Sequence, residues 1–493
     1  MSGAPSLKRN FLINLASPVS RIVVAFVTVP LFIHHIGNAR YGVLSIVWVV
    51  LGYAGFLDLG MSRAAVNALS KLRHAPQPER ARVLVTTLAV NLMFGVTAAV
   101  IGYIFADLIF SHFMKVPEDL MPEIRAALPW IAGMIPVSFL MGAGIGALES
   151  KERFALANFL TVLGMSITQI LPVVVAIWLS PSLAYVIPAV AFSSYFTLII
   201  VLIIIVRSEG PFHSSSFSFA QAKALLNYGG WVAVTNFLGV SLWTLDQFMI
   251  GGIVGVAAVA YYAVASRLVL QSTVFSNALA RTLFPRLSLV SASEALNLAA
   301  RAFVALAYGY GAIVATAIVI TPVFFHFWLG ETFAVVSSPL AQIMFLGILF
   351  NSFVVVPHHL LQGQGRPDLP GKMNVIEFLP FFACLWFATT HFGLTGAAAI
   401  WVLRNVFEAV VLLWLSKMPR SSILASVPAI GLCLVALLVA REVGPDPVLA
   451  IPAAVVVGAI SAGIALLQSE DLRKMAVNMT GRVVSLSGLR NLA

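Results

Sequence analysis

The feature that most constrains this chain is a series of apolar segments, each long enough to cross a lipid bilayer. Crossing takes about 20 apolar helical residues. We identify fourteen such segments, at 10–36, 40–64, 83–111, 125–148, 155–179, 184–206, 223–251, 256–284, 301–329, 337–361, 373–391, 394–416, 423–441 and 449–468. A backbone inside lipid must satisfy its own hydrogen bonds, so we expect helices. The sequence therefore predicts an all-α polytopic membrane protein.

Composition supports this fold class. Of 493 residues, 60% are hydrophobic and 10% are charged, whereas soluble domains have about 25% charged residues. The chain has no Walker loop, so ATP hydrolysis is not expected. His326 and the pair His358-His359 have no third ligand at suitable spacing, so we expect no metal. We expect a protein that is not an enzyme and has no cofactor.

Lysine and arginine predict the orientation in the membrane. If the N-terminus is cytoplasmic, 22 of the 29 Lys and Arg residues face the cytoplasm and 4 face the other side. The positive-inside rule explains this asymmetry and the net charge of +10, so we expect no nucleic-acid partner. Both termini are predicted to be cytoplasmic, in the inner membrane of a bacterium.

An internal repeat divides the chain. An offset of 218 residues places Gly37 on Gly255 and Arg63 on Arg281, and an offset of 216 places Asn158 on Asn374. Two six-helix lobes of the same orientation are expected, as in transporters whose substrate path lies between parallel repeats. The predicted parts are a first lobe at 1–210, a linker at 211–222, a second lobe at 223–420, two further helices at 421–470 and a basic tail at 471–493.

Three arginines are predicted at mid-depth in the membrane. Arg21, Arg267 and Arg404 each lie about 15–16 Å inside their segments. Of the acids, only Glu408 shares this depth, so we expect a net positive centre that binds an anion. Guanidinium groups suit pyrophosphate because they bond its oxygens in pairs. The alternative is that the arginines pair with acids and hold helices together.

Other polar residues complete the candidate site. Asn14 belongs to a polar stripe with Asn10, Ser17, Arg21 and Thr28, which either lines a wet cavity or joins helices. Arg63 and Arg281, at cytoplasmic helix ends, are candidates to receive a lipid pyrophosphate, or simply anchor the helices. Asp246, Glu408 and Asp58 are candidates for proton or sodium coupling. For Asp246, a structural partner or exposure at the rim is the alternative.

Several motifs resemble those of a known family. In the first half they are Asn14, Pro30, Gly37-x-x-x-Tyr41-Gly42 and Asp58-Leu59-Gly60; in the second half they are Asp246 to Gly251, Tyr261-Tyr262 and Leu360 to Arg366. Their order is similar to that in bacterial polysaccharide flippases of the multidrug/oligosaccharidyl-lipid/polysaccharide exporter superfamily. The resemblance covers roughly 8–415, and the last two helices look like those of fourteen-helix members.

The resemblance implies a V-shaped transporter that flips polyprenyl-pyrophosphate oligosaccharides for exopolysaccharide, capsule or O-antigen synthesis. Membrane lipids and the polymerase and export machinery of the same pathway are the implied partners. Two alternatives belong to the same superfamily, a drug exporter and a peptidoglycan lipid-precursor flippase. A membrane glycan polymerase or ligase is the alternative from another class, and the short outer loops argue against it.

Overall fold

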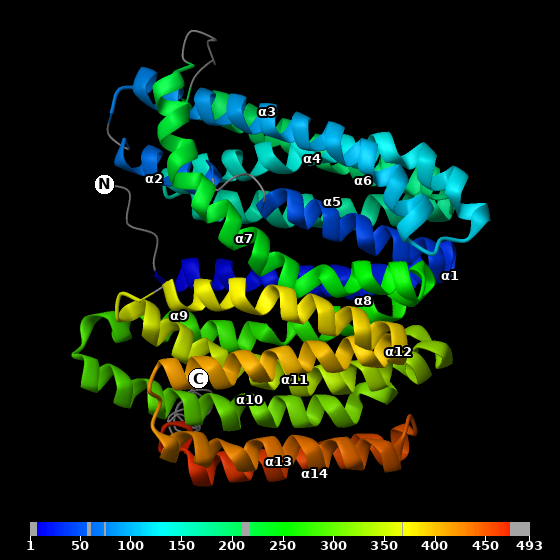
Figure 1. The fold of residues 1–493 in the computed structure, drawn as a ribbon, viewed down its shortest axis with the longest axis vertical. Helices are drawn as coiled ribbons and strands as arrows, with labels where there is room; N and C mark the ends of the chain where they lie inside the picture. Colours follow the sequence, from blue (N-terminus) through cyan, green and yellow to red (C-terminus); the bar gives the residue numbers. More distant parts are fainter. Residues whose placement is uncertain (1–6, 57–60, 73–74, 210–216, 367, 474–493) are drawn as a thin grey trace, which may run out of the picture. The chain divides into compact units, whose positions relative to one another are not determined.

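All regular elements among the described residues are helices. The computed structural model describes residues 7–56, 61–72, 75–209, 217–366 and 368–473 (Figure 1). Within these ranges, the side chains of 7–19, 21, 53–56, 61–64, 209, 224–237, 240, 278–282, 284 and 285 are not described. The chain forms two compact units, Met1–Ala260 and Tyr261–Ala493.

The first unit is built around one central helix. Its elements are α1 (Leu7–Phe56), α2 (Met61–Lys71), α3 (Gln77–Leu108), a π-helical turn (Ile109–Phe113), a 3-10 turn (Glu118–Leu120), α4 (Met121–Ser150), α5 (Phe154–Trp178), α6 (Leu183–Glu209), α7 (Phe219–Ile253) and the start of α8 (Val256–Gln271). Helix α4 contacts α1, α2, α3, α5 and α6, and it runs beside α3 and α6 (Figure 1). Helix α7 packs on α1, α2 and α3.

The second unit is organised around α10. It contains the rest of α8, then α9 (Thr273–Leu289), α10 (Ala292–Leu329), α11 (Glu331–Gly363), α12 (Asp368–Leu415), α13 (Arg420–Val443) and α14 (Pro447–Gln468). Helix α10 contacts α11, α13 and α14, and α11 contacts α12. Ser291 and Glu294 form a reciprocal cap at the start of α10, which satisfies backbone donors that a helix start leaves free.

Glycines interrupt the two longest helices. Helix α1 contains Gly37 with φ of 78°, and α12 contains Gly393 with φ of 58°. This left-handed backbone favours glycine and cannot continue a helix. Each long element therefore consists of two helical segments, which correspond to the predicted pairs 10–36 with 40–64 and 373–391 with 394–416.

A third glycine permits a close backbone approach. A Cβ atom built on Gly42 would lie 1.8 Å from the carbonyl oxygen of Val256, so α1 and the start of α8 touch through their backbones. The structure also divides the predicted segment 256–284, because α8 ends at Gln271 and α9 begins at Thr273.

The membrane-spanning character of the fold is clear. Ten helices among the described residues are long and apolar enough to cross a bilayer, so the chain is a multi-pass membrane protein. The count of fourteen spans, the symmetry of two lobes, the V shape and the cytoplasmic termini stay predictions. The predicted lobe boundary at 211–222 also stays a prediction, and 210–216 lie outside the described residues.

Candidate functional site

A buried ion cluster joins the two segments of α12. Arg404 donates to Glu377 Oε1 from Nη2 at 2.9 Å and from Nε at 3.2 Å, and to Glu408 Oε2 from Nη2 at 3.3 Å. The Arg404 and Glu377 side chains are 4% and 3% exposed. The Phe381 ring centroid lies 5.7 Å from the guanidinium carbon. Because Glu377 and Arg404 flank Gly393, the cluster holds the two segments together.

The cluster corrects the expected charge at mid-depth. Glu377 was not expected at this depth, because the predicted segment begins at 373, only four residues before it. Helix α12 begins at Asp368 instead, which puts Glu377 about 14 Å inside it. Two carboxylates therefore contact Arg404, so this cluster by itself has no net positive charge. The net charge of the predicted centre with Arg21 and Arg267 stays a prediction. The ion pairs favour the alternative in which Arg404 holds helices together.

Arg267 lies near an interruption between two helices. It is half-buried, four residues before the end of α8 at Gln271. The hydroxyl of Ser272, in the interruption, lies 2.5 Å from that of Tyr310 on α10. Ser272 keeps right-handed helical dihedrals, φ −66° and ψ −19°, so the break is local and does not unwind the backbone. The role of Arg267 in binding substrate stays a prediction.

Asp246 is buried, which excludes the expected alternative of exposure at the rim. Asp246 is 3% exposed and lies seven positions before the end of α7 at Ile253. One carboxylate oxygen accepts from the backbone N–H of Gln247 at 2.8 Å. A buried acid within a membrane helix is typical of a functional site or of a structural partner, and both stay open.

Thr28 shows how one member of the polar stripe is used. Its hydroxyl donates to Gln169 Oε1 of α5 at 2.9 Å, and the residue is 3% exposed. This contact joins α1 to α5, as the helix-joining alternative predicts for the stripe. Asn14 and Arg21 of the same stripe lie among the side chains that are not described. The cavity-lining role therefore stays a prediction for them.

Three other candidates also fall outside the described parts. The side chains of Arg63 and Arg281 are not described, and Asp58 lies within 57–60, outside the described residues. The predicted roles of these three residues in receiving substrate or coupling ion stay predictions.

The histidines make local contacts. The side-chain amide of Gln362 contacts two histidines: its Nε2 lies 2.9 Å from His358 Nε2, and its Oε1 lies 3.3 Å from His359 Nδ1. Nδ1 of His326 lies 2.8 Å from Glu331 Oε2. In the described parts of the chain, no group of three His, Cys, Asp or Glu residues is placed to hold a metal ion.

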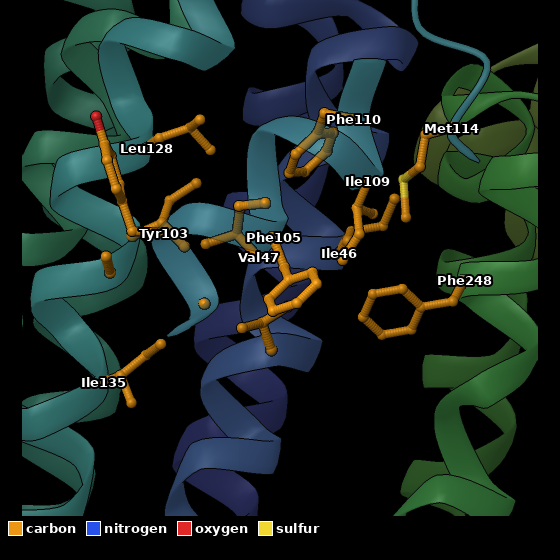
Figure 2. Close-up of a pocket in the computed structure, with 15 residues that line it drawn as sticks. Ile46, Val47, Tyr103, Phe105, Ile109, Phe110, Met114, Leu128, Ile135 and Phe248 are labelled. Carbon is orange, nitrogen blue, oxygen red and sulfur yellow. The ribbon is translucent and has the colours of Figure 1, made fainter. Parts of the chain in front are cut away.

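The first unit contains an apolar pocket of about 140 Å³. Figure 2 shows side chains of α1, α3, α4 and α7 around it, among them Val47, Phe105, Ile135 and Phe248. None of its lining residues is charged, and Tyr103 alone contributes a hydroxyl. Such a lining suits hydrocarbon and offers a pyrophosphate no positive charge, so this pocket is not the expected anion site.

Two polar clamps of the first unit were not identified from the sequence. Arg80 precedes the predicted segment 83–111 and is therefore one of the 22 charges predicted to face the cytoplasm, but it is 4% exposed and donates to the carbonyl of Leu69 at 2.9 Å. Arg40 donates to both oxygens of Glu123, at 2.6 and 2.9 Å, and Glu123 also accepts from the N–H of Leu183. These are long-range pairings, which residue type and spacing do not indicate.

Comparisons with known proteins agree with the resemblance. The sequence profile of a family described as polysaccharide biosynthesis protein matches residues 7–291. A putative O-antigen transporter of Shigella flexneri is 24% identical over 415 residues, which cover 83% of this chain and 97% of that protein.

Two solved structures are similar in fold. The lipid II flippase MurJ, in an inward closed conformation, gives a TM-score of 0.72 at 14% identity and covers 95% of this chain and 100% of its own. An inward-facing multidrug resistance MATE family transporter of the MOP superfamily gives 0.67 at 16% identity and covers 83% and 97%. At these identities the likeness concerns the fold alone. Since the profile matches more than half of the sequence, the chain belongs to the polysaccharide biosynthesis protein family.

Proposed function

We propose that this protein is a flippase for polyprenyl-pyrophosphate-linked oligosaccharides in a bacterial inner membrane. It would carry repeat units from the cytoplasmic to the periplasmic leaflet for exopolysaccharide, capsule or O-antigen synthesis. The observation that carries the proposal is the match to a putative O-antigen transporter across 97% of that protein. The family match and a fold shared with a lipid II flippase support it.

The mechanism we propose is alternating access of two six-helix lobes. The oligosaccharide pyrophosphate enters a central cavity and the polyprenyl chain stays in lipid. Arg21 and Arg267 bind the pyrophosphate, while Arg63 and Arg281 receive it at the cytoplasmic ends of their helices. Asn14 contributes to the polar lining. This assignment is supported by the half-buried position of Arg267 within the apolar helix α8.

Arg404 has a different place in this scheme. Two carboxylates already bind its guanidinium, and a pyrophosphate would have to displace them. We therefore assign Arg404 to the support of α12. We further propose that transport is coupled to protons or sodium ions through Asp246, Glu408 or Asp58. The proposed protein partners are the polymerase and export machinery of the same pathway.

A drug exporter remains the second candidate function. The fold shared with a multidrug transporter favours it. Export of organic cations needs buried acids, and Asp246 is one in the first unit. A transport assay with cationic dyes separates the two functions, because a flippase for an anionic lipid is expected to leave dye distribution unchanged.

The test of the proposed function uses purified protein in liposomes that contain a polyprenyl-pyrophosphate oligosaccharide. An enzyme that modifies the sugar is added outside, and newly exposed sugar is measured over time. Removal of charged hydrogen bonds to the pyrophosphate costs about 1.5–3 kcal/mol each, or roughly 10- to 100-fold. We expect Arg21→Ala and Arg267→Ala to lose transport to this extent.

The control is Arg420→Ala, which removes an exposed arginine at the start of α13. It should flip lipid at the wild-type rate. Movement that is unaffected by Arg21→Ala and Arg267→Ala, in folded protein, would contradict the cationic site. No movement with the wild-type protein under any gradient would contradict the flippase function itself.

A further inference from the structure

The ion cluster of α12 contains more carboxylate than its arginine neutralises. Arg404 supplies one positive charge, whereas Glu377 and Glu408 supply two negative charges when both are ionised. Glu377 Oε2 is buried and accepts no hydrogen bond from any described residue. A buried charge without a counter-charge is costly, and so is a buried acceptor without a donor. The cluster is therefore one positive charge short of neutrality.

Among the described residues, α12 and the helix packed on it, α11, do not supply that charge. Helix α11 packs on α12 and has no ionisable residue between Glu331 and His358. On α12 itself, Lys372 is exposed and pairs with Asp368 at 2.8 Å. The other titratable groups of α12 are Cys384 and His391, both exposed. Within the part of the chain that the structure describes, Arg404 is thus the cation that forms ion pairs with the two acids.

We propose that Glu377 and Glu408 form a proton-binding site that takes up one proton in total, with Arg404 as a fixed counter-ion. The proton adds to a carboxylate oxygen, and Glu377 Oε2 is the oxygen that is free to form the O–H bond. The product is a neutral cluster of one guanidinium, one carboxylate and one carboxylic acid. A metal cation fits less well, because the guanidinium already lies between the two acids and would repel it.

The site links protonation to the packing of α12. With a proton bound, the cluster is neutral and suits the dry position that it has in this structure. After the proton leaves to water, one negative charge has no partner, which favours a conformation in which water reaches the cluster. Since Glu377 and Arg404 lie on opposite sides of Gly393, such a change would separate the two segments of α12.

The first test measures proton binding in the full chain, in lipid nanodiscs and without substrate. Infrared difference spectra between pH 5 and pH 9 report the carbonyl stretch of protonated carboxylic acids. We expect a glutamic acid band that persists at pH 7, where an exposed glutamate is ionised. The band should be lost in Glu377→Gln and in Glu408→Gln, and it should be unchanged in Asp368→Asn, the exposed acid of the same helix.

The single variants are suited to this test because each leaves Arg404 with one carboxylate, which mimics the neutral cluster. The double variant leaves Arg404 without a carboxylate in the cluster, so we expect a lower folded yield from it than from either single variant. A wild-type spectrum without a protonated glutamic acid at pH 7 would overturn the proposal. A band that remains in both single variants would overturn it as well.

The second test asks whether the site drives transport, and it rests on the proposed flippase function. Sugar exposure is followed in liposomes with and without an imposed pH gradient. The wild-type rate should respond to the gradient, whereas Glu377→Gln should flip lipid at a rate that ignores it. If the variant keeps the full response, the site does not drive transport. If the infrared band behaves as expected but the wild-type protein moves no lipid, the flippase function fails and the proton site stands.

Discussion

Arg80 provides a sharp test of how the first unit is held together. Its guanidinium donates to the carbonyls of Leu69 and Leu72 at 2.9 and 3.2 Å, and to the hydroxyl of Ser150 at 3.4 Å. Leu69 lies in the last turn of α2, where helix carbonyls lack intrahelical partners and favour a cation. Arg80 therefore ties the end of α2 to α3 and α4.

Replacing Arg80 by methionine keeps most of the side-chain volume and removes every donor. A hydrogen bond from a charged group contributes about 1.5–3 kcal/mol, and an orphaned buried carbonyl costs about 1–3 kcal/mol. These terms overlap, so we expect a net loss of about 2–4 kcal/mol. At about 2–4 °C per kcal/mol for a unit of this size, the midpoint of thermal unfolding should fall by roughly 4–16 °C.

The assay is thermal unfolding in detergent at one fixed scan rate, because membrane proteins often unfold irreversibly. Arg82→Met is the matched control, since Arg82 is exposed two positions further along the same helix. Arg80→Lys should fall between wild type and methionine, because an ammonium group keeps the charge but loses the planar fork. Equal midpoints for Arg80→Met and Arg82→Met would refute the clamp.

Three further predictions concern helix contacts in the first unit. Gly42→Ala should lower the unfolding midpoint, because its methyl group would clash with the backbone of α8, whereas Gly52→Ala, with nothing within 4 Å, should not. A double-mutant cycle of Arg40→Gln and Glu123→Gln, measured by the same unfolding assay, should give a coupling of about 0.5–1 kcal/mol, because the pair is partly exposed. Thr28→Val should cost about 1 kcal/mol and leave flipping in liposomes intact, since the hydroxyl joins two helices.

The apolar segments could be predicted because bilayer thickness imposes one length on all of them. The breaks at Gly37 and Gly393 fall between predicted segments, since a polar or glycine-containing turn must separate two spans. The break at Ser272 was not expected, because the three polar residues Gln271, Ser272 and Thr273 are too few to end an apolar segment. Hydropathy measures transfer into lipid and is insensitive to a local change of backbone hydrogen bonding.

The ion cluster shows where the prediction of the site reached its limit. Arg404 and Glu408 were expected to be close because they are four residues apart on one helix. Glu377 was missed because its depth depends on where the helix begins. Asp368 and Pro370 were the available signals, since acidic residues and proline are typical of a first helical turn. Five residues of error moved the acid by about 7 Å.

Depth in the membrane is therefore a weak guide to the role of a buried arginine. Arg267 and Arg404 lie at about the same predicted depth. Arg404 contacts two carboxylates, both of them on α12, whereas Arg267 is half-buried near the end of α8. An anionic substrate can use only a guanidinium whose existing partners it can outcompete, and two buried carboxylates in a dry site are strong competitors. The charge available to a pyrophosphate is set by such local pairing rather than by the number of arginines at mid-depth. The two carboxylates that pair with Arg404 leave no room for a pyrophosphate on its guanidinium. They can still bind a smaller ligand, and the proposed ligand is a proton.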